Sequence, residues 1–195
     1  MGQLSEAQDF FERAIKLARN VGARNFEADA LSRLVAVSLG HGNKIKAQQL
    51  AKQAVEIVRQ VGMTFIGPAV LVELASATDN VSERWAALEE AEAILDSGCV
   101  IHNQFWFADR TIDLCLEIGE WDQVERYVDR LEAFTLEQPL PWSDYMVARG
   151  RALAAWGRGR RGAELEAQLK SLVSTAEQVG LISAVPALKN ALKTR

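Results

Sequence analysis

The feature that most constrains this sequence is an internal repeat with a period of 40 residues. When residues 2–22 are aligned with residues 42–62, the identical positions in the first copy are Gly2, Ala7, Gln8, Ala14, Arg19, Val21 and Gly22. A third, degenerate copy ends at Gly98, and two further helix starts follow at Trp121 and Gly162. A period of this length is typical of stacked helix pairs, so the sequence predicts a helical repeat protein.

Apolar residues within each copy recur at helical spacing. Ala47, Leu50, Ala54 and Val58 follow one another at steps of three or four residues, which places them on one face of a helix. The whole chain of 195 residues holds only 4 prolines and 13 glycines, so little interrupts such helices. We predict helices over residues 4–21, 25–39, 44–61, 66–78, 82–97, 102–118, 121–136, 142–156, 163–179 and 184–193.

Signals for helix ends support these boundaries. Ser5 with Gln8 and Asn80 with Glu83 have the spacing of a capping box. Glycines that can close a last helical turn follow four apolar runs, at Gly22, Gly62, Gly98 and Gly180. The loops between helices are short, so we expect one continuous domain over residues 1–195.

The first predicted helix resembles the second helix of a repeat pair. Its apolar side chains Phe10, Phe11, Ile15 and Leu17 would then lack part of their cover. Two explanations are open: a neighbouring protomer covers them, or the chain is a fragment of a longer protein. We favour the fragment.

Residues 31–54 match the tetratricopeptide pattern at Leu31, Leu34, Gly42, Ala47 and Ala54. Val35 replaces the usual small glycine, Ser38 replaces the usual tyrosine, and the period exceeds the typical 34 residues. The sequence therefore resembles a tetratricopeptide region. This resemblance implies an all-α fold in which antiparallel helix pairs stack into a right-handed α-solenoid.

A second resemblance rests on SGCVIHNQFWF at 97–107, GEWD at 119–122, PLPW at 139–142 and ARGRAL at 148–153. These segments are similar to the carboxy-terminal repeats of large bacterial signalling proteins that join an adenylate/guanylate cyclase domain to a P-loop ATPase domain. The resemblance implies a regulatory or docking tail, with catalysis upstream. The chain contains neither a GxxxxGK[ST] phosphate loop nor paired metal-binding aspartates in a cyclase context. We therefore expect no enzymatic activity and no cofactor.

Composition narrows the classes of partner. A net charge of −4 argues against nucleic acid, because phosphate binding needs a basic surface. The longest apolar stretches, such as residues 66–72, are shorter than a bilayer span, and we expect a cytoplasmic protein. Cys99, Cys115, His41 and His102 do not have the spacing of metal ligands, so we expect no metal site.

The helix predicted over residues 102–118 carries a mixed aromatic and charged stripe, formed by Trp106, Asp109, Arg110, Asp113 and Glu117. One interpretation is a recognition surface in which Trp106 anchors a partner and Arg110 pairs with a carboxylate. The other is a solvated face with ion pairs inside the helix. At the start of this helix, His102 and Asn103 either contact a bound group or, in the case of Asn103, cap the helix.

Trp142, Tyr145 and Arg149 begin the next first-type helix and would lie beside this stripe if neighbouring repeats stack in sequence. The candidate partner-binding residues are therefore Trp106, Asp109, Arg110, Asp113, Trp142, Tyr145 and Arg149. The expected function is a non-catalytic scaffold for a protein or peptide partner, with an acidic segment favoured by the arginines. The alternatives are a self-assembling module, as a homodimer through the first helix, and a small-molecule sensor domain.

Overall fold

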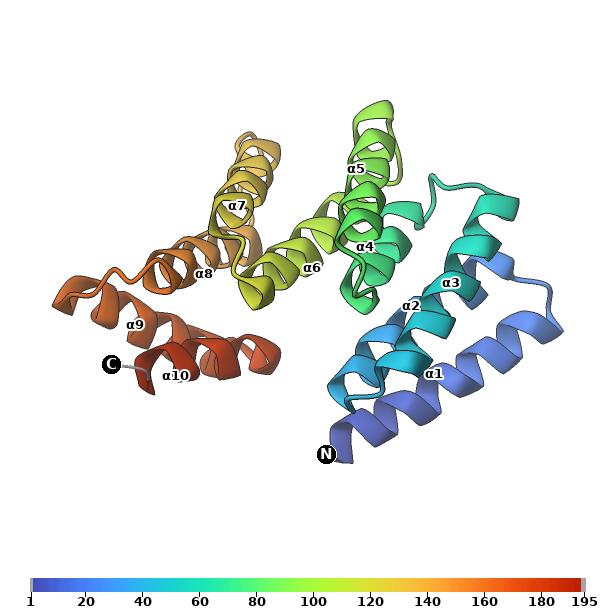
Figure 1. Ribbon diagram of the computed structural model, residues 1–195, viewed down its shortest axis with the longest axis horizontal. Helices are drawn as coiled ribbons and strands as arrows, with labels where there is room; N and C mark the ends of the chain where they lie inside the picture. The colour runs from blue at the N-terminus through green and yellow to red at the C-terminus, as the bar shows by residue number, and fades with distance from the viewer. Residues whose placement is uncertain (1, 194–195) are drawn as a thin grey trace. The chain divides into compact units, whose positions relative to one another are not determined.

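The computed structural model describes residues 2–193, which form helices joined by short loops and contain no β-strand (Figure 1). The helices are α1 (Gly2–Asn20), α2 (Arg24–Gly40), α3 (Lys44–Val61), α4 (Gly67–Ala77), α5 (Val81–Ser97), α6 (His102–Ile118), α7 (Trp121–Thr135), α8 (Pro141–Gly157), α9 (Ala163–Val179) and α10 (Val185–Lys193), with a short 3-10 turn, η1, at Ile182–Ala184. The predicted all-α class is confirmed, and the predicted helices agree with those observed to within two residues at each end.

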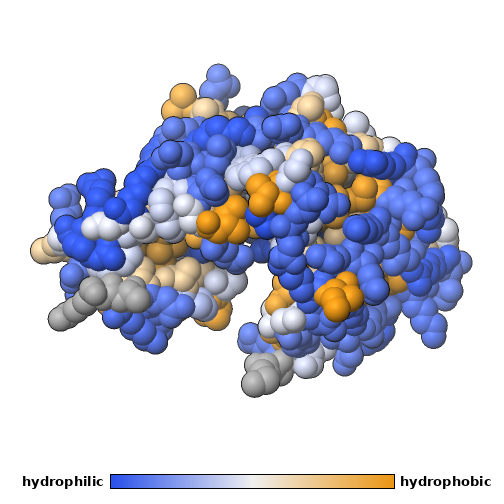
Figure 2. Space-filling view, in the orientation of Figure 1, coloured by the Kyte–Doolittle hydropathy of each residue, from blue (hydrophilic) through white to orange (hydrophobic). Residues whose placement is uncertain are grey.

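The chain divides into two compact units, Met1–Phe107 and Ala108–Arg195, and the division falls inside α6. We call them the first and second units and describe each by itself. The single domain expected over residues 1–195 stays a prediction. Apolar side chains reach the surface as separate patches among mostly hydrophilic ones (Figure 2).

Small residues bring the helices of the first unit together. α2 packs against α1, α3 and α4, and α4 also packs against α3 and α5. Val35 of α2, Ala47 and Ala51 of α3 and Ala77 of α4 form one buried cluster. Methyl side chains let helix backbones approach closely, so the short side chains of the repeat determine where α3 contacts its neighbours.

Helix caps confirm some of the predicted end signals and correct one. The Asn80 side chain accepts a hydrogen bond of 3.1 Å from the Glu83 amide at the start of α5, as predicted. Asn43 caps α3 in the same way through the Lys46 amide, at 3.1 Å. The cap predicted at Ser5 is wrong, because α1 begins at Gly2 and Ser5 already lies inside the helix.

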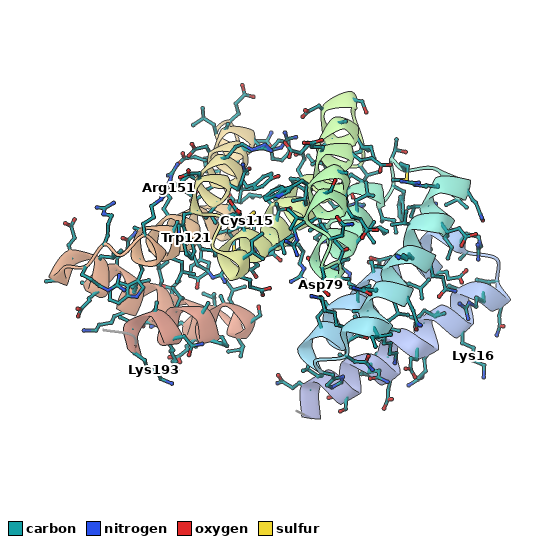
Figure 3. The ribbon with its side chains drawn as sticks, in the orientation of Figure 1. Lys16, Asp79, Cys115, Trp121, Arg151 and Lys193 are labelled. Carbon is teal, nitrogen blue, oxygen red and sulfur yellow. The ribbon has the colours of Figure 1, made fainter. Side chains whose placement is uncertain are left out.

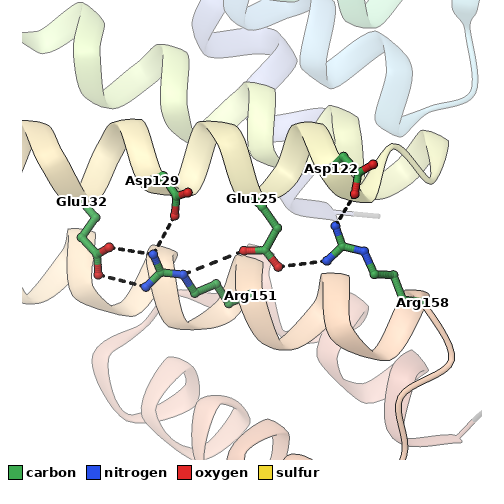
Figure 4. A network of polar contacts seen from close by, with 6 residues as sticks. All are labelled: Asp122, Glu125, Asp129, Glu132, Arg151 and Arg158. Atoms are coloured by element: carbon green, nitrogen blue, oxygen red, sulfur yellow. Dashed lines mark hydrogen bonds and ion pairs between the residues drawn. The ribbon is translucent and has the colours of Figure 1, made fainter.

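In the second unit, charged side chains join the surfaces of α7 and α8. α8 also packs against α9 and α10. The Arg151 guanidinium lies 2.6 Å from Glu132 and 2.8 Å from Asp129, and Arg158 lies 2.6 Å from Asp122 (Figure 4). Glu125 is within 3.1 Å of Arg158. Arg151 of α8 and Arg158, which directly follows that helix, therefore meet a row of four acids on α7.

Beneath this charged row, α7 and α8 approach closely. Val124, Val128 and Leu131 are buried on one face of α7, as their spacing predicted. A Cβ atom at Gly150 of α8 would lie 2.6 Å from the Val128 side chain. Gly150 therefore lets the backbone of α8 pack directly against the valine.

Candidate partner-binding surface

The predicted binding residues are distributed over both units. Trp106 belongs to the first unit, whereas Asp109, Arg110, Asp113, Trp142, Tyr145 and Arg149 belong to the second. We therefore describe the surroundings of Trp106 and those of the other residues separately.

In the first unit, Trp106 lies between a cation and a second ring. The Arg33 guanidinium carbon, from α2, is 4.2 Å from the centroid of the Trp106 ring. The His102 ring, one turn earlier on α6, is 4.4 Å away on a tilted plane. A guanidinium this close to an indole interacts favourably with the negative face of the ring. Arg33 thus attaches α2 to the first turns of α6.

The ring contacts continue beyond His102. Phe65 meets His102 edge to face at 5.7 Å, and Phe26 meets Phe65 edge to face at 5.8 Å. Aromatic pairs favour this geometry because the positive edge of one ring faces the negative surface of the next. We call Phe26, Phe65, His102 and Trp106 the aromatic ladder, and it ends at Arg33.

Hydrogen bonds fix the middle of the ladder. His102 Nε2 lies 2.9 Å from the Phe65 carbonyl oxygen, and Asn103 Nδ2 donates to the same oxygen at 2.9 Å. The Val100 amide donates to the Thr64 carbonyl at 3.0 Å. The segment between α3 and α4 is thereby held against the start of α6, and the position of the Phe65 ring is set.

The capping role predicted for Asn103 is wrong. A capping asparagine accepts a backbone amide through its side-chain oxygen. Here Asn103 is buried, its Nδ2 donates to carbonyl oxygens of Thr64, Phe65 and Val100, and its Oδ1 has no hydrogen-bond partner within residues 2–193. Asn103 therefore connects α6 to the preceding segment instead of capping α6.

One end of the ladder is open to solvent and the other is charged. The Phe26 side chain is 62% exposed, whereas Phe65, His102 and Trp106 are half-buried. Arg33 also forms an ion pair with Asp29 at 3.3 Å, one turn earlier on α2. The surface thus offers a protruding ring, a partly covered indole and an arginine whose carboxylate partner is itself half-exposed.

The sequence reasoning found Trp106 but missed Phe26, Phe65 and Arg33. A usable signal exists in α2, because Phe26, Asp29 and Arg33 follow one another at steps of three and four residues and so share a face. The contact between Phe65 and His102 joins residues 37 positions apart and leaves no such periodic trace.

In the second unit, three predicted residues come together inside the packing. Arg149 is 3% exposed, and its Nη1 lies 2.6 Å from the Asp113 carboxylate. Tyr145 is buried, and its hydroxyl donates to the Leu172 carbonyl of α9 at 3.3 Å. Burial raises the pKa of the Tyr145 hydroxyl, and the nearby Arg149 charge partly offsets that rise. These contacts join α8 to α6 and to α9.

The remaining predicted residues are half-buried. Asp109 and Arg110 lie on α6 and Trp142 lies in the first turn of α8, and each of the three has interaction partners of its own. Partner binding by the six residues of the second unit stays a prediction.

Two comparisons of this chain with known proteins found no match. No protein-family model matches it, and no curated protein matches its sequence. Within residues 2–193, no three His, Cys, Asp or Glu side chains gather closely enough to hold a metal ion. No helix in that range combines the length and apolar character needed to cross a membrane.

Proposed function

We propose that this chain is a tetratricopeptide-like scaffold, with antiparallel helix pairs stacked as a right-handed solenoid, that binds a protein or peptide at the aromatic ladder. The observation that supports this most is the stacking of Arg33 on Trp106 at one end of a ladder of rings whose other end is the exposed Phe26 ring. Tryptophan and arginine are the side chains that most often dominate the binding energy of protein interfaces. Following the second resemblance, we further propose that the scaffold serves as the docking part of a bacterial signalling protein.

The chemistry of the ladder favours a segment that is both acidic and apolar. A partner carboxylate can replace Asp29 as the ion-pair partner of Arg33, which remains stacked on the indole. An apolar side chain of the partner would cover Phe26. Because Arg33 and Asp29 are partly exposed, salt should screen the ion pair between Arg33 and the partner carboxylate and so weaken binding.

A small-molecule sensor is the weaker candidate. A hollow of about 240 Å³ in the second unit is lined mainly by apolar side chains, among them Leu116, Trp121, Leu153 and Trp156. Ligand pockets usually measure about 300–1,000 Å³ and contain several converging polar groups. This hollow is smaller and mostly apolar, so a protein or peptide partner fits the surface chemistry better.

The experiment is selection of peptides from a random display library on the full chain, followed by affinity measurements on the selected peptides. We expect acidic peptides with one or two large apolar side chains. Trp106→Ala should weaken their binding about 30-fold, as expected for loss of an anchor ring. Arg33→Gln should weaken it less and remove most of its salt dependence.

Phe10 provides the matched control. It is 58% exposed on α1, close to the exposure of Phe26, but it is not part of the ladder. Phe26→Ala should therefore weaken peptide binding and Phe10→Ala should not, with circular dichroism showing that both variants are folded. If folded Trp106→Ala and Phe26→Ala bind as tightly as the wild type, the proposed surface is wrong.

A further inference from the structure

The outer side of α1 is an apolar stripe open to solvent. Phe10, Ala14 and Leu17 follow one another at steps of four and three residues, so they lie on one side of the helix, and Val21 continues this spacing just past its last residue, Asn20. Phe10 is 58% exposed, Leu17 is 64% exposed and Val21 is 68% exposed. A shallow groove along this side is lined by Phe10, Leu17 and the neighbouring Arg13 and Lys16. We call the four apolar residues Phe10, Ala14, Leu17 and Val21 the outer stripe.

The internal repeat shows what such a stripe does when it has a partner. Forty positions later, the equivalent residues of α3 are Leu50, Ala54, Ile57 and Val61. Ala54 is 0% exposed and Ile57 is 3% exposed, and Leu50 packs on the buried cluster between α2, α3 and α4. The same pattern of apolar positions is therefore a helix-packing surface in α3.

The charged residues of α1 also differ between the side that packs within the first unit and the outer side. Toward the inside of the first unit, Arg19 pairs with Glu27 at 2.7 Å and Glu12 lies 3.6 Å from Lys46. Beside the outer stripe, Glu6, Asp9, Arg13 and Lys16 have no ion-pair partner within residues 2–193. Figure 3 shows Lys16 extending away from the helices on which α1 packs.

These unpaired charges are separated along the helix. Along α1, Glu6 and Asp9 lie in the amino-terminal half, and Arg13 and Lys16 lie in the carboxy-terminal half. An identical helix in antiparallel orientation, crossing the first near Arg13, would place its Lys16 near Asp9 of the first, and the reverse. A parallel copy would place like charges side by side.

We infer that α1 associates with α1 of a second copy of this chain, in antiparallel orientation about a two-fold axis near Arg13 and Ala14. Phe10 of each copy then packs on Leu17 of the other, and Asp9 faces Lys16 across the contact. Ala14 near the centre allows the helix axes to approach to about 8–10 Å. The interface is isologous, so it closes at a dimer. This inference is independent of the proposed binding at the aromatic ladder.

The interface is small. α1 has 19 residues, which corresponds to a length of about 28 Å. Stable interfaces usually bury about 1,200–2,000 Å² in total, and a single helix pair lies at the lower end of that range. We therefore expect a reversible dimer with a dissociation constant on the order of tens of micromolar at low salt.

Sedimentation equilibrium of the full chain, from about 5 to about 500 µM, measures this dimer. Leu17→Glu should weaken association at least about 30-fold, because it places a carboxylate in the apolar centre of the contact. Ile45→Glu is the control: Ile45 is 73% exposed on α3 and lies outside the stripe, so its replacement should leave the dimer unchanged.

Charge exchange tests the antiparallel two-fold arrangement. Asp9→Lys alone and Lys16→Asp alone should each be monomeric, because like charges then face each other at both symmetric contacts. A mixture of the two variants should form a heterodimer, because each introduced side chain then faces an opposite charge. A monomeric wild type at the highest concentration, a dimer that survives Leu17→Glu, or a mixture that stays monomeric would each overturn the inference.

Discussion

Helices α1 and α3 have related sequences but different surroundings. The segments that contain them, residues 2–22 and 42–62, share seven identical positions, and both helices bury the side that packs within the first unit. In α3 the equivalents of the outer stripe are also largely covered, with Ala54 and Ile57 buried, whereas in α1 Phe10 and Leu17 are exposed. The repeat pattern therefore determines which residues are suited to packing, and the neighbouring helices determine which of them are buried.

The largest expected difference in stability between α3 and α1 is at Ile57 and Leu17, the large apolar residues at equivalent positions. Ile57→Ala should lower the free energy of unfolding by about 2–5 kcal/mol, because it removes a buried side chain and leaves a cavity. The equivalent Leu17→Ala in α1 should change it by less than about 0.5 kcal/mol in dilute solution. Urea unfolding of both variants at low micromolar concentration measures the difference. Equal losses would mean that α1 is covered on both sides even in the monomer.

A smaller difference is expected at the alanine in each stripe. Ala54→Leu should cost about 1–3 kcal/mol, because the larger side chain overfills the contact between α3 and its neighbours. Ala14→Leu should stay within about 0.5 kcal/mol of the wild type. An unchanged melting temperature for Ala54→Leu would show that Ala54 does not lie in a close helix contact.

These pairs also show why the fold was predictable. Apolar spacing and the glycines after each run located the helices, because those signals act within a few residues of one another. The exposure of the α1 stripe depends on neighbouring helices, and equivalent positions such as Ala14 and Ala54 carry the same residue with opposite burial. Local pattern therefore predicts the helix and its packing face but not whether that face is covered.

The starts of the two helices sharpen the comparison further. Asn43 caps α3, whereas its repeat equivalent, Gln3, lies inside α1. Asn43→Ala should therefore cost about 1 kcal/mol, the usual value of a lost cap. Gln3→Ala should have almost no effect, because Gln3 is exposed and alanine favours the helix. Thermal unfolding of both variants tests this, and a larger loss for Gln3→Ala would contradict the assigned start of α1.

The smallest expected effect on stability comes from the charged row on α7, whose contribution, unlike the apolar packing at α3, should depend on pH. A hydrogen bond from Arg151 lowers the pKa of Glu132. A carboxylate with a lowered pKa stabilises the fold above its unfolded-state pKa and loses that contribution as pH falls through its folded-state pKa. The stability difference between the wild type and Arg151→Met should therefore be present at pH 7 and shrink below about pH 4.3.

Arg160→Met is the control for the charged row, because Arg160 contacts none of the four α7 acids. Its stability difference from the wild type should stay small and nearly independent of pH. A difference for Arg151→Met that stays constant between pH 7 and pH 3 would show that Glu132 does not contribute through its charge. The loss of stability in Ile57→Ala, in contrast, involves no titrating side chain and so should not follow the titration of Glu132.

The candidate surface was less predictable than the helices. The mixed stripe on α6 pointed to Trp106, but its cationic partner is Arg33, which is 73 positions earlier in the chain. The same stripe pointed to Asp113, and the next first-type helix to Arg149, yet these two form a mostly buried ion pair within the second unit. Residue type and helical spacing identify side chains capable of recognition. Only the contacts between helices separate those that hold the unit together from those open to a partner.

Hydrogen–deuterium exchange of the full chain at about 5 and about 500 µM tests the contrast between α1 and α3 most directly. At the low concentration, amides of α1 should exchange faster than those of α3, because α1 is covered on one side. At the high concentration, α1 should become more protected as the outer stripe is covered by a second copy, while α3 stays unchanged. Equal protection of α1 and α3 at the low concentration, or no gain in α1 at the high one, would contradict the account.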